Sequence, residues 1–201
     1  MGLKLAPGRT LYFARHGQTQ ANVERRFSSY KDTPLTALGL EQAAQVGRIL
    51  KRELGMAEGY AFVSSPLARA VTTMNIARTT MGLPPDGFST DNRLKEINLG
   101  SWDQLTDEEA RAQSPTLFAQ RGDDKWHVRV PGGENYAEVA ARVSDWLGGL
   151  EQHTFAISHG ATTRILRGLL AGLDWRAMSA LDEPQGVVFR VRGTEVVRLD
   201  P

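Results

Sequence analysis

The 201-residue sequence contains no cysteine. This absence excludes disulfide scaffolds, cysteine-ligated zinc, iron–sulfur clusters and thiol nucleophiles, so any chemistry must use oxygen and nitrogen groups. Long apolar runs are also missing: no stretch approaches the roughly 18 residues of a membrane span, and residues 1–9 hold no apolar segment of signal-peptide length. We therefore expect no membrane partner and a cytoplasmic location.

The sequence also lacks an excess of charge of either sign. It has 24 basic and 23 acidic residues and a formal net charge of +1, which is too balanced for the long-range attraction that nucleic acid or an anionic membrane requires. We expect no nucleic-acid partner. Hydrophobic residues make up 41% and charged residues 23% of the chain, and no linker or repeat divides it. This pattern predicts one globular domain over residues 1–201.

Short apolar strands alternate with helical patterns along the chain. Residues 10–14 are β-branched and aromatic, whereas residues 38–54 carry apolar side chains at helical spacing. Ser65 and Pro66 are interpreted as the N-cap and first-turn proline of a helix that runs toward Met81. The alternation predicts an α/β fold of three layers, with helices on both faces of a mostly parallel central sheet. The expected strands are 10–14, 61–64, 88–90, 154–158, 187–192 and 195–199, and further helices are expected from Thr106, over 136–150 and 161–171, and near Trp175.

The segment of about 102–133 has the least regular sequence, and residues 120–134 are rich in Gly, Asp and Pro. We expect this part of the chain to be exposed and to cover a ligand pocket as a lid or insertion. Phe118, Trp126, His127 and Arg129 are candidates for contact with the organic part of a substrate. For the two aromatic residues, packing of the lid against the core is the favoured interpretation.

Polar side chains follow three of the expected strands where each strand ends. The first strand leads into Arg15 and His16, the second into Ser65 and, one turn later, Arg69, and the third into His159. Carboxyl ends of parallel strands share one edge of a sheet, where helix N-termini present free N–H groups to anions. Two imidazoles and two guanidiniums at this edge predict a phosphate pocket. A two-histidine metal site is the alternative, which the flanking arginines and the lack of an adjacent carboxylate disfavour.

Four motifs in this chain occur in the order that is typical of one protein family. They are Arg15-His16-Gly17-Gln18-Thr19 with Asn22, Ser64-Ser65-Pro66-Leu67-Ala68-Arg69-Ala70, Leu94-Lys95-Glu96-Ile97-Asn98-Leu99-Gly100-Ser101-Trp102, and Ser158-His159-Gly160. Each motif alone is weak, but four in order from about Leu11 to beyond Gly160 are specific. The chain resembles the histidine phosphatase superfamily, which is also called the phosphoglycerate mutase-like family.

The resemblance implies phosphoryl transfer with His16 as the nucleophile. His16 would attack phosphorus in line and form a phosphohistidine, which water would then hydrolyse. Arg15 and Arg69 would bind the phosphoryl group, and their charge would favour the neutral, nucleophilic imidazole. His159 would donate to the phosphoryl oxygens. The residues alone do not distinguish the roles of the two histidines; the family motif assigns the attack to His16.

Glu96 resembles the general acid of the family, which protonates the leaving oxygen and then activates water. This role requires a raised pKa, through burial or a neighbouring anion. The alternative for Glu96 is a surface salt bridge with Lys95 or Arg93. No metal or cofactor is expected. The motifs imply five further substrate-binding residues, with Thr19 as a supporting contact: Gly17, Gln18, Thr19, Asn22 and Gly160.

The superfamily contains both mutases and phosphatases. Phosphoglycerate mutases usually carry an acidic residue after the Arg-His-Gly motif, whereas this chain has Gln18. The sequence therefore predicts a metal-independent phosphomonoester hydrolase for a small phosphorylated metabolite, similar to the broad-specificity and α-ribazole phosphatases. A mutase-type isomerase and a catalytically silent phosphate-binding protein are the alternatives. We expect a monomer, or a homodimer formed through the edge of the 187–199 hairpin.

Overall fold

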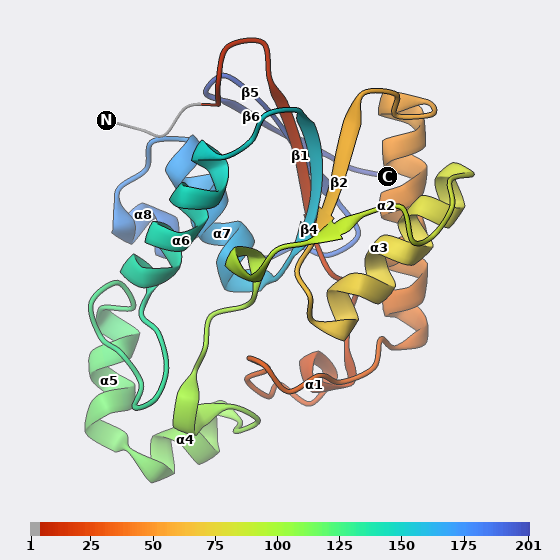
Figure 1. The fold of residues 1–201 in the computed structure, drawn as a ribbon. Coiled ribbons are helices and arrows are strands. Elements are labelled where there is room, and N and C mark those ends of the chain that lie inside the picture. Colours follow the sequence, from red (N-terminus) through yellow and green to blue (C-terminus); the bar gives the residue numbers. More distant parts are fainter. Residues whose placement is uncertain (1–4) are drawn as a thin grey trace.

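A six-stranded sheet forms the centre of the computed structural model, which describes residues 5–201 (Figure 1). The strand order is β3-β2-β4-β1-β5-β6. The first four strands of this order are parallel to one another, and β5 and β6 are antiparallel additions. The predicted α/β class and mostly parallel sheet are thus confirmed. The strands are β1 Thr10–Arg15, β2 Tyr60–Ser64, β3 Ser89–Thr90, β4 His153–Ser158, β5 Val188–Arg192 and β6 Glu195–Leu199.

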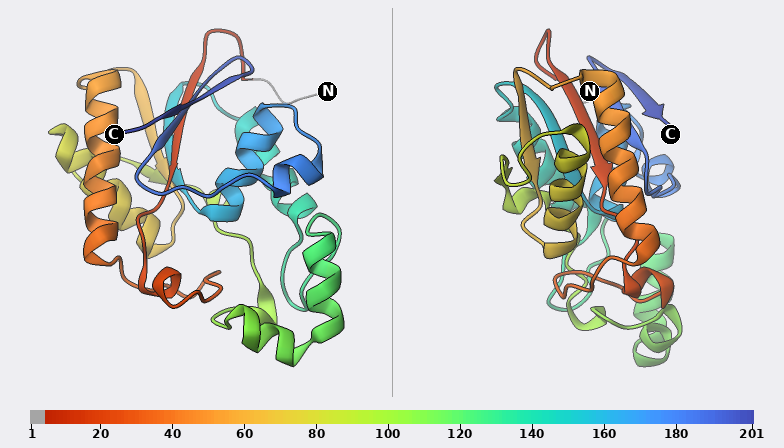
Figure 2. Two further views of the ribbon diagram at one scale, coloured as in Figure 1. Left: turned by 180° about the vertical axis from the view of Figure 1, so that it is seen from behind. Right: turned by 90° about the vertical axis from the view of Figure 1, so that its right-hand side faces the viewer.

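Helices cover both faces of this sheet, which gives the three predicted layers (Figure 2). Side chains of β1 alternate between two cores, because successive residues of a strand point to opposite faces. Leu11 and Phe13 pack on one side, and Tyr12 and Ala14 on the other. Full burial of Phe13 alone contributes roughly 1.5–3 kcal/mol. The helices on the Tyr12 side are α2 Ala37–Leu54 and α3 Ala68–Met81, and those on the Phe13 side are α6 Tyr136–Gly148, α7 Gly160–Leu170 and α8 Trp175–Ser179.

The start of α3 differs from the sequence prediction. Leu67, not Ser65, is the N-cap residue, and it provides no side-chain hydrogen bond. The carboxylate of Asp32 accepts from the N–H groups of Ala68 (2.9 Å) and Arg69 (3.4 Å) instead. A residue distant in sequence therefore satisfies the helix terminus that a local serine was expected to cap. Ser65 is left for another contact.

The predicted lid segment contains more regular structure than its composition suggested. It forms α4 (Asp107–Gln113) and α5 (Pro115–Asp123), and the capping box of Thr106 and Glu109 opens α4 as expected. Both helices lie beyond the carboxyl ends of the central strands, as does α1 (Gln20–Val23) (Figure 1). The expectation of an exposed excursion over 120–134 is partly wrong, because Arg121 and Val130 are buried.

Candidate active site

The carboxyl ends of β1, β2 and β4 meet because β4 pairs with β1 on one side and with β2 on the other. Arg15 at the end of β1 lies opposite Ser158 at the end of β4. The residues that follow, His16 and His159, therefore lie side by side. Their rings are 5.1 Å apart between centroids and inclined by 61°. The predicted meeting of the two histidines at one sheet edge is thus observed.

The His16 ring is held with one nitrogen available for chemistry. Its Nδ1 lies 2.7 Å from the carbonyl oxygen of Gly17, which only a protonated Nδ1 can satisfy. In the neutral ring, Nε2 then carries the lone pair, and it accepts from Nε–H of Arg69 at 3.3 Å. Burial, and next the charges of Arg15 and Arg69, hold the pKa of His16 well below its ordinary value. His16 is therefore a neutral imidazole with an unprotonated Nε2.

Arg69 is 2% exposed and donates all five of its N–H groups within the protein. One goes to His16, and one goes to Asp32 in a 2.8 Å ion pair. The other three go to the carbonyl oxygens of Ser28, Ser29 and Lys31. A phosphoryl oxygen would have to displace one of these acceptors. In this structure Arg69 therefore orients His16 and has no free N–H donor for a phosphoryl group.

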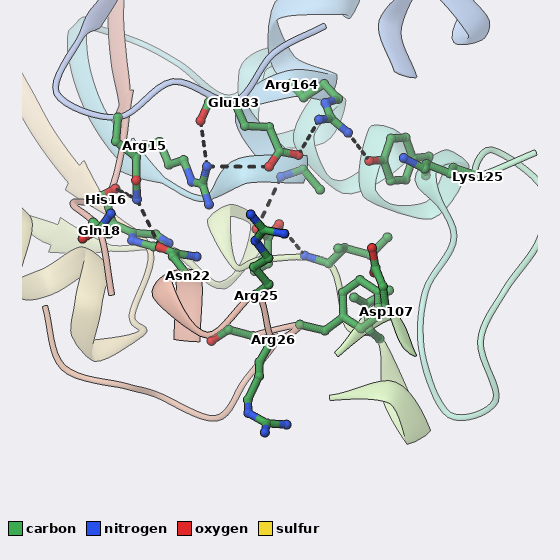
Figure 3. Close-up of a pocket in the computed structure, with 18 of the residues that line it drawn as sticks. Arg15, His16, Gln18, Asn22, Arg25, Arg26, Asp107, Lys125, Arg164 and Glu183 are labelled. Carbon is green, nitrogen blue, oxygen red and sulfur yellow. Dashed lines mark hydrogen bonds and ion pairs between the residues drawn. The ribbon is translucent and has the colours of Figure 1, made fainter. Parts of the chain in front are cut away.

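Not every N–H donor of Arg15 has a partner among the described residues. Its Nη1 donates to the carbonyl oxygen of Glu183 at 2.7 Å and lies 3.6 Å from the Glu183 carboxylate. Its buried Nε has no partner among residues 5–201. The same Glu183 carboxylate pairs with Arg164 at 2.9 Å, and Arg164 donates to the hydroxyl of Tyr136 at 3.0 Å. Figure 3 shows this chain of contacts leading from Arg15, beside His16, across the cavity toward Lys125.

The carboxyl group of Glu96 lies at the N-terminus of α7. It accepts from the N–H of Ile97 at 2.9 Å and from the N–H groups of Ala161 and Thr162, each at 3.3 Å. Burial raises its pKa, and the Glu183 carboxylate raises it further, against the lowering effect of the hydrogen bond from Ile97. Glu96 makes no ion pair with a neighbouring cation within residues 5–201, so the surface salt bridge alternative is wrong.

His159 is completely buried, with no exposed surface. Its Nε2 lies 2.7 Å from the hydroxyl of Ser65, and its Nδ1 has no partner in the described chain. Burial, followed by the charge of Arg69, holds the pKa of His159 well below its ordinary value. The ring is therefore neutral and carries a proton on one nitrogen only.

Two of the other predicted substrate-binding residues line the cavity, and the remaining three do not. Gln18 and Asn22 line the cavity, and the amide oxygen of Asn22 is held by Thr19 N–H and Gln185. Thr19 is fully buried and caps α1, which agrees with a supporting position. Gly17 donates its N–H to Thr73, and a Cβ there would overlap the carbonyl of Gly39. Gly160 begins α7, so its N–H has no intrahelical partner.

Arg15, His16, Gln18, Asn22 and Glu96 line a cavity of about 610 Å³, whereas Arg69 and His159 do not belong to its wall. Sequence reasoning missed much of its wall, because no motif marks these positions and the fold brings them in from four separate segments. Glu183 and Gln185 come from the loop before β5, and two of the cations come from the segment predicted to be a lid. The missed lining residues include Arg121, Lys125, Tyr136, Arg164, Glu183 and Gln185.

The lid candidates do not gather at this cavity. Phe118 and Trp126 pack against the hydrophobic core on the Phe13 side of the sheet, which is the interpretation favoured for these two aromatic residues. His127 and Arg129 are exposed. Within residues 5–201, no three His, Asp or Glu side chains lie close enough together to hold a metal ion. The same residues contain no helix that is long and apolar enough to cross a membrane.

Comparison with known proteins places this arrangement in a family. Residues 11–195 match the histidine phosphatase superfamily (branch 1). The chain belongs to this superfamily. A glucosyl-3-phosphoglycerate phosphatase from Mycolicibacterium vanbaalenii is 33% identical over 82% of this chain and 75% of that protein. A protein from Salmonella paratyphi B named "Probable phosphoglycerate mutase" is 31% identical over 94% of this chain and 84% of its own length.

Solved structures of the superfamily share this fold. The α-ribazole phosphatase from Shigella flexneri superposes with a TM-score of 0.82 over 96% of each chain, at 24% identity. At that identity the likeness shows the fold alone. The central sheet and its flanking helices therefore have the fold of this phosphatase, and the sequence match over residues 11–195 confirms the family resemblance.

Proposed function

We propose that this histidine phosphatase superfamily member is a phosphomonoester hydrolase that acts on a small phosphorylated metabolite through a phosphohistidine on His16. One observation carries the proposal. The same cavity holds a neutral imidazole with an unprotonated Nε2 and a partly buried carboxyl group, Glu96, whose pKa is raised. The lowered pKa of His16 favours the unprotonated nucleophile, and the raised pKa of Glu96 favours the protonated acid, as the two roles require.

In the first half-reaction, the lone pair of His16 Nε2 forms a bond to phosphorus while the ester P–O bond breaks. Glu96 gives its proton to the departing oxygen, so the leaving group departs as an alcohol. Arg15, the Asn22 amide and the N–H of Gly160 bind the phosphoryl oxygens, and His159 donates to the charge that develops on them. Arg69 donates to the Nε2 lone pair of His16 in this structure, and this hydrogen bond has to break as Nε2 attacks phosphorus.

In the second half-reaction, Glu96 is a carboxylate and acts as the base. It takes a proton from a water molecule, whose oxygen bonds to phosphorus as the P–N bond breaks. The electron pair returns to His16 Nε2, and inorganic phosphate leaves. Both catalytic groups are restored, and every step uses groups of this chain.

The surroundings of the cavity favour a small anionic substrate. Six cationic side chains line it against three carboxyl groups, one of which is Glu96 with its raised pKa. The six are Arg15, Arg25, Arg26, Arg121, Lys125 and Arg164. Local positive charge of this kind attracts a phosphate monoester although the whole chain carries a formal charge of only +1.

The test is release of inorganic phosphate from p-nitrophenyl phosphate by the wild type and by His16→Ala, each with and without EDTA. We expect turnover by the wild type that EDTA does not reduce, and a loss of at least about 10³-fold in kcat for His16→Ala, in line with the loss of a covalent nucleophile. Activity that survives in His16→Ala would contradict the phosphohistidine route. Activity that disappears with EDTA would contradict a metal-independent enzyme.

A mutase is the second candidate, and the similarity to the Salmonella protein favours it. The second half-reaction would then return the phosphoryl group to a substrate hydroxyl instead of to water. Supplying 3-phosphoglycerate with a bisphosphoglycerate primer distinguishes the two. Isomerisation with little release of phosphate would overturn the hydrolase proposal, and phosphate release without isomerisation would support it.

A further inference from the structure

Ser65 lies directly after β2 and beside His159, in a position that its expected role does not explain. It was predicted to cap α3, yet Leu67 is the N-cap residue and the Asp32 carboxylate accepts from the first N–H groups of the helix. Ser65 itself is completely buried at the end of β2. Its hydroxyl lies 2.7 Å from Nε2 of His159, across 94 residues of sequence.

The hydrogen-bond partners of Ser65 decide the direction of this contact. Its Oγ accepts from the N–H of Leu67 at 3.3 Å, a group that can only donate. Within residues 5–201, Nε2 of His159 is the one acceptor in reach of the serine proton. A buried hydroxyl that left its proton unused would lose the free energy of that hydrogen bond. The serine therefore donates, and Nε2 of His159 accepts.

This direction fixes the tautomer of His159. Burial and nearby positive charge keep the ring neutral, so it holds a single proton. With Nε2 accepting, that proton is on Nδ1, the buried nitrogen that has no protein partner in the described chain. The opposite tautomer would direct a lone pair from Nδ1, which an anionic phosphoryl oxygen would repel.

We propose that Ser65 is a positioning residue that holds neutral His159 in its Nδ1–H tautomer, so that His159 can donate a hydrogen bond to the phosphoryl group without carrying a positive charge. The catalytic part of this inference rests on the proposed hydrolase function, whereas the tautomer itself does not. The same logic operates at His16, where a backbone carbonyl selects Nδ1–H, but there it releases a lone pair for attack. The two neighbouring histidines thus share a tautomer but differ at the other contact: Nε2 of His16 accepts from Arg69, whereas Nδ1 of His159 has no partner in the described chain.

The direct test is a long-range ¹H–¹⁵N spectrum of the ¹⁵N-histidine-labelled wild type at neutral pH. The His159 signals are assigned by their loss in His159→Gln. We expect protonated Nδ1 and unprotonated Nε2. A wild-type His159 protonated on Nε2 would overturn the proposal without any substitution at Ser65, and would do so whether or not the chain hydrolyses phosphate esters.

Three substitutions then test the cause. Ser65→Ala should move the His159 proton to Nε2, at least in part, and lower kcat by about tenfold or more, as expected for the weakening of one transition-state donor. Ser65→Thr keeps the hydroxyl and should restore both the tautomer and most of kcat. Ser64→Ala is the matched control, because it removes a buried hydroxyl that donates to the backbone carbonyl of Ser65 and forms no hydrogen bond with a histidine among the described residues. The His159 tautomer should stay unchanged. An unchanged tautomer in Ser65→Ala would refute the role of the hydroxyl.

Discussion

The ion pair of Arg69 with Asp32 is the structural feature whose removal gives the sharpest test of how the nucleophile is held. Asp32 accepts from Nη1 of Arg69 at 2.8 Å and also accepts from the first N–H groups of α3. The Arg69 side chain is 1% exposed and that of Asp32 is 33% exposed. Asp32→Ala would therefore leave a buried guanidinium and a helix terminus without their carboxylate.

The expected cost follows from these two losses. Removing one partner of a buried ion pair costs about 3–5 kcal/mol, and losing an N-terminal acceptor costs about 1 kcal/mol. The exposure of Asp32 and the carbonyl acceptors that remain on Arg69 reduce the first figure, because water and backbone oxygens still solvate the charge. We expect a loss of about 3 kcal/mol in the free energy of unfolding, or roughly 6–12 °C in Tm for a domain of this size.

Urea unfolding at neutral pH measures this loss, and two further variants separate its parts. Asp32→Asn keeps an oxygen for the α3 terminus and should recover about 1 kcal/mol. Asp123→Ala removes an exposed aspartate with no hydrogen bond or ion pair within residues 5–201, and should change stability by less than about 0.5 kcal/mol. Asp32→Ala should also lower kcat, because Arg69 then orients His16 less firmly.

A small effect would refute this reasoning. If Asp32→Ala costs no more than Asp123→Ala, the carboxylate does not stabilise the buried Arg69. If stability falls as expected but kcat is unchanged, Arg69 does not need Asp32 to hold the nucleophile. The two readouts therefore test the energetic and the catalytic parts of the argument separately.

Two further perturbations test the electrostatics and the packing of the site. Glu183→Gln removes an anion that raises the pKa of Glu96, so this pKa should fall. Glu96 then loses its proton at lower pH, and the basic limb of the kcat–pH profile should move to lower pH. A basic limb that stays in place or moves to higher pH would contradict this coupling. Gly17→Ala places a Cβ against the Gly39 carbonyl and should cost about 1–3 kcal/mol or more. Gly122→Ala in α5 meets no atom within 4 Å and should stabilise the chain by about 0.5–1 kcal/mol; equal effects of the two glycine substitutions in urea unfolding would refute the packing argument.

The parts of the site that the sequence predicted are those that local patterns encode. An apolar run that ends in Arg15 and His16, and another that ends in His159, identify strand ends, and parallel pairing then brings these ends together. Glu96 was recognised from its family motif. Its role requires a raised pKa, and partial burial and the Glu183 carboxylate both raise the pKa of Glu96 in the structure.

The parts that the sequence did not predict depend on tertiary contacts. Asp32 lies in an irregular loop, and nothing in its neighbours indicates that it pairs with Arg69, 37 residues away. Glu183 reaches Arg15 over 168 residues. For Ser65, a local rule gave a definite but wrong role, because a serine before a proline is often an N-cap and the folded chain supplied another acceptor for the helix. Competition of this kind between a local and a distant partner is decided only in the folded chain.

The claim that His16 forms a covalent bond to phosphorus is tested most directly by trapping the intermediate. The wild type is mixed with a ³²P-labelled phosphate monoester, quenched within milliseconds in alkali, digested and mapped. We predict acid-labile, alkali-stable phosphate on the peptide that contains His16, in an amount that approaches one per active site when hydrolysis of the intermediate is slow, and none in His16→Ala. Turnover with no labelled peptide, or label on the peptide that contains His159, would contradict the account.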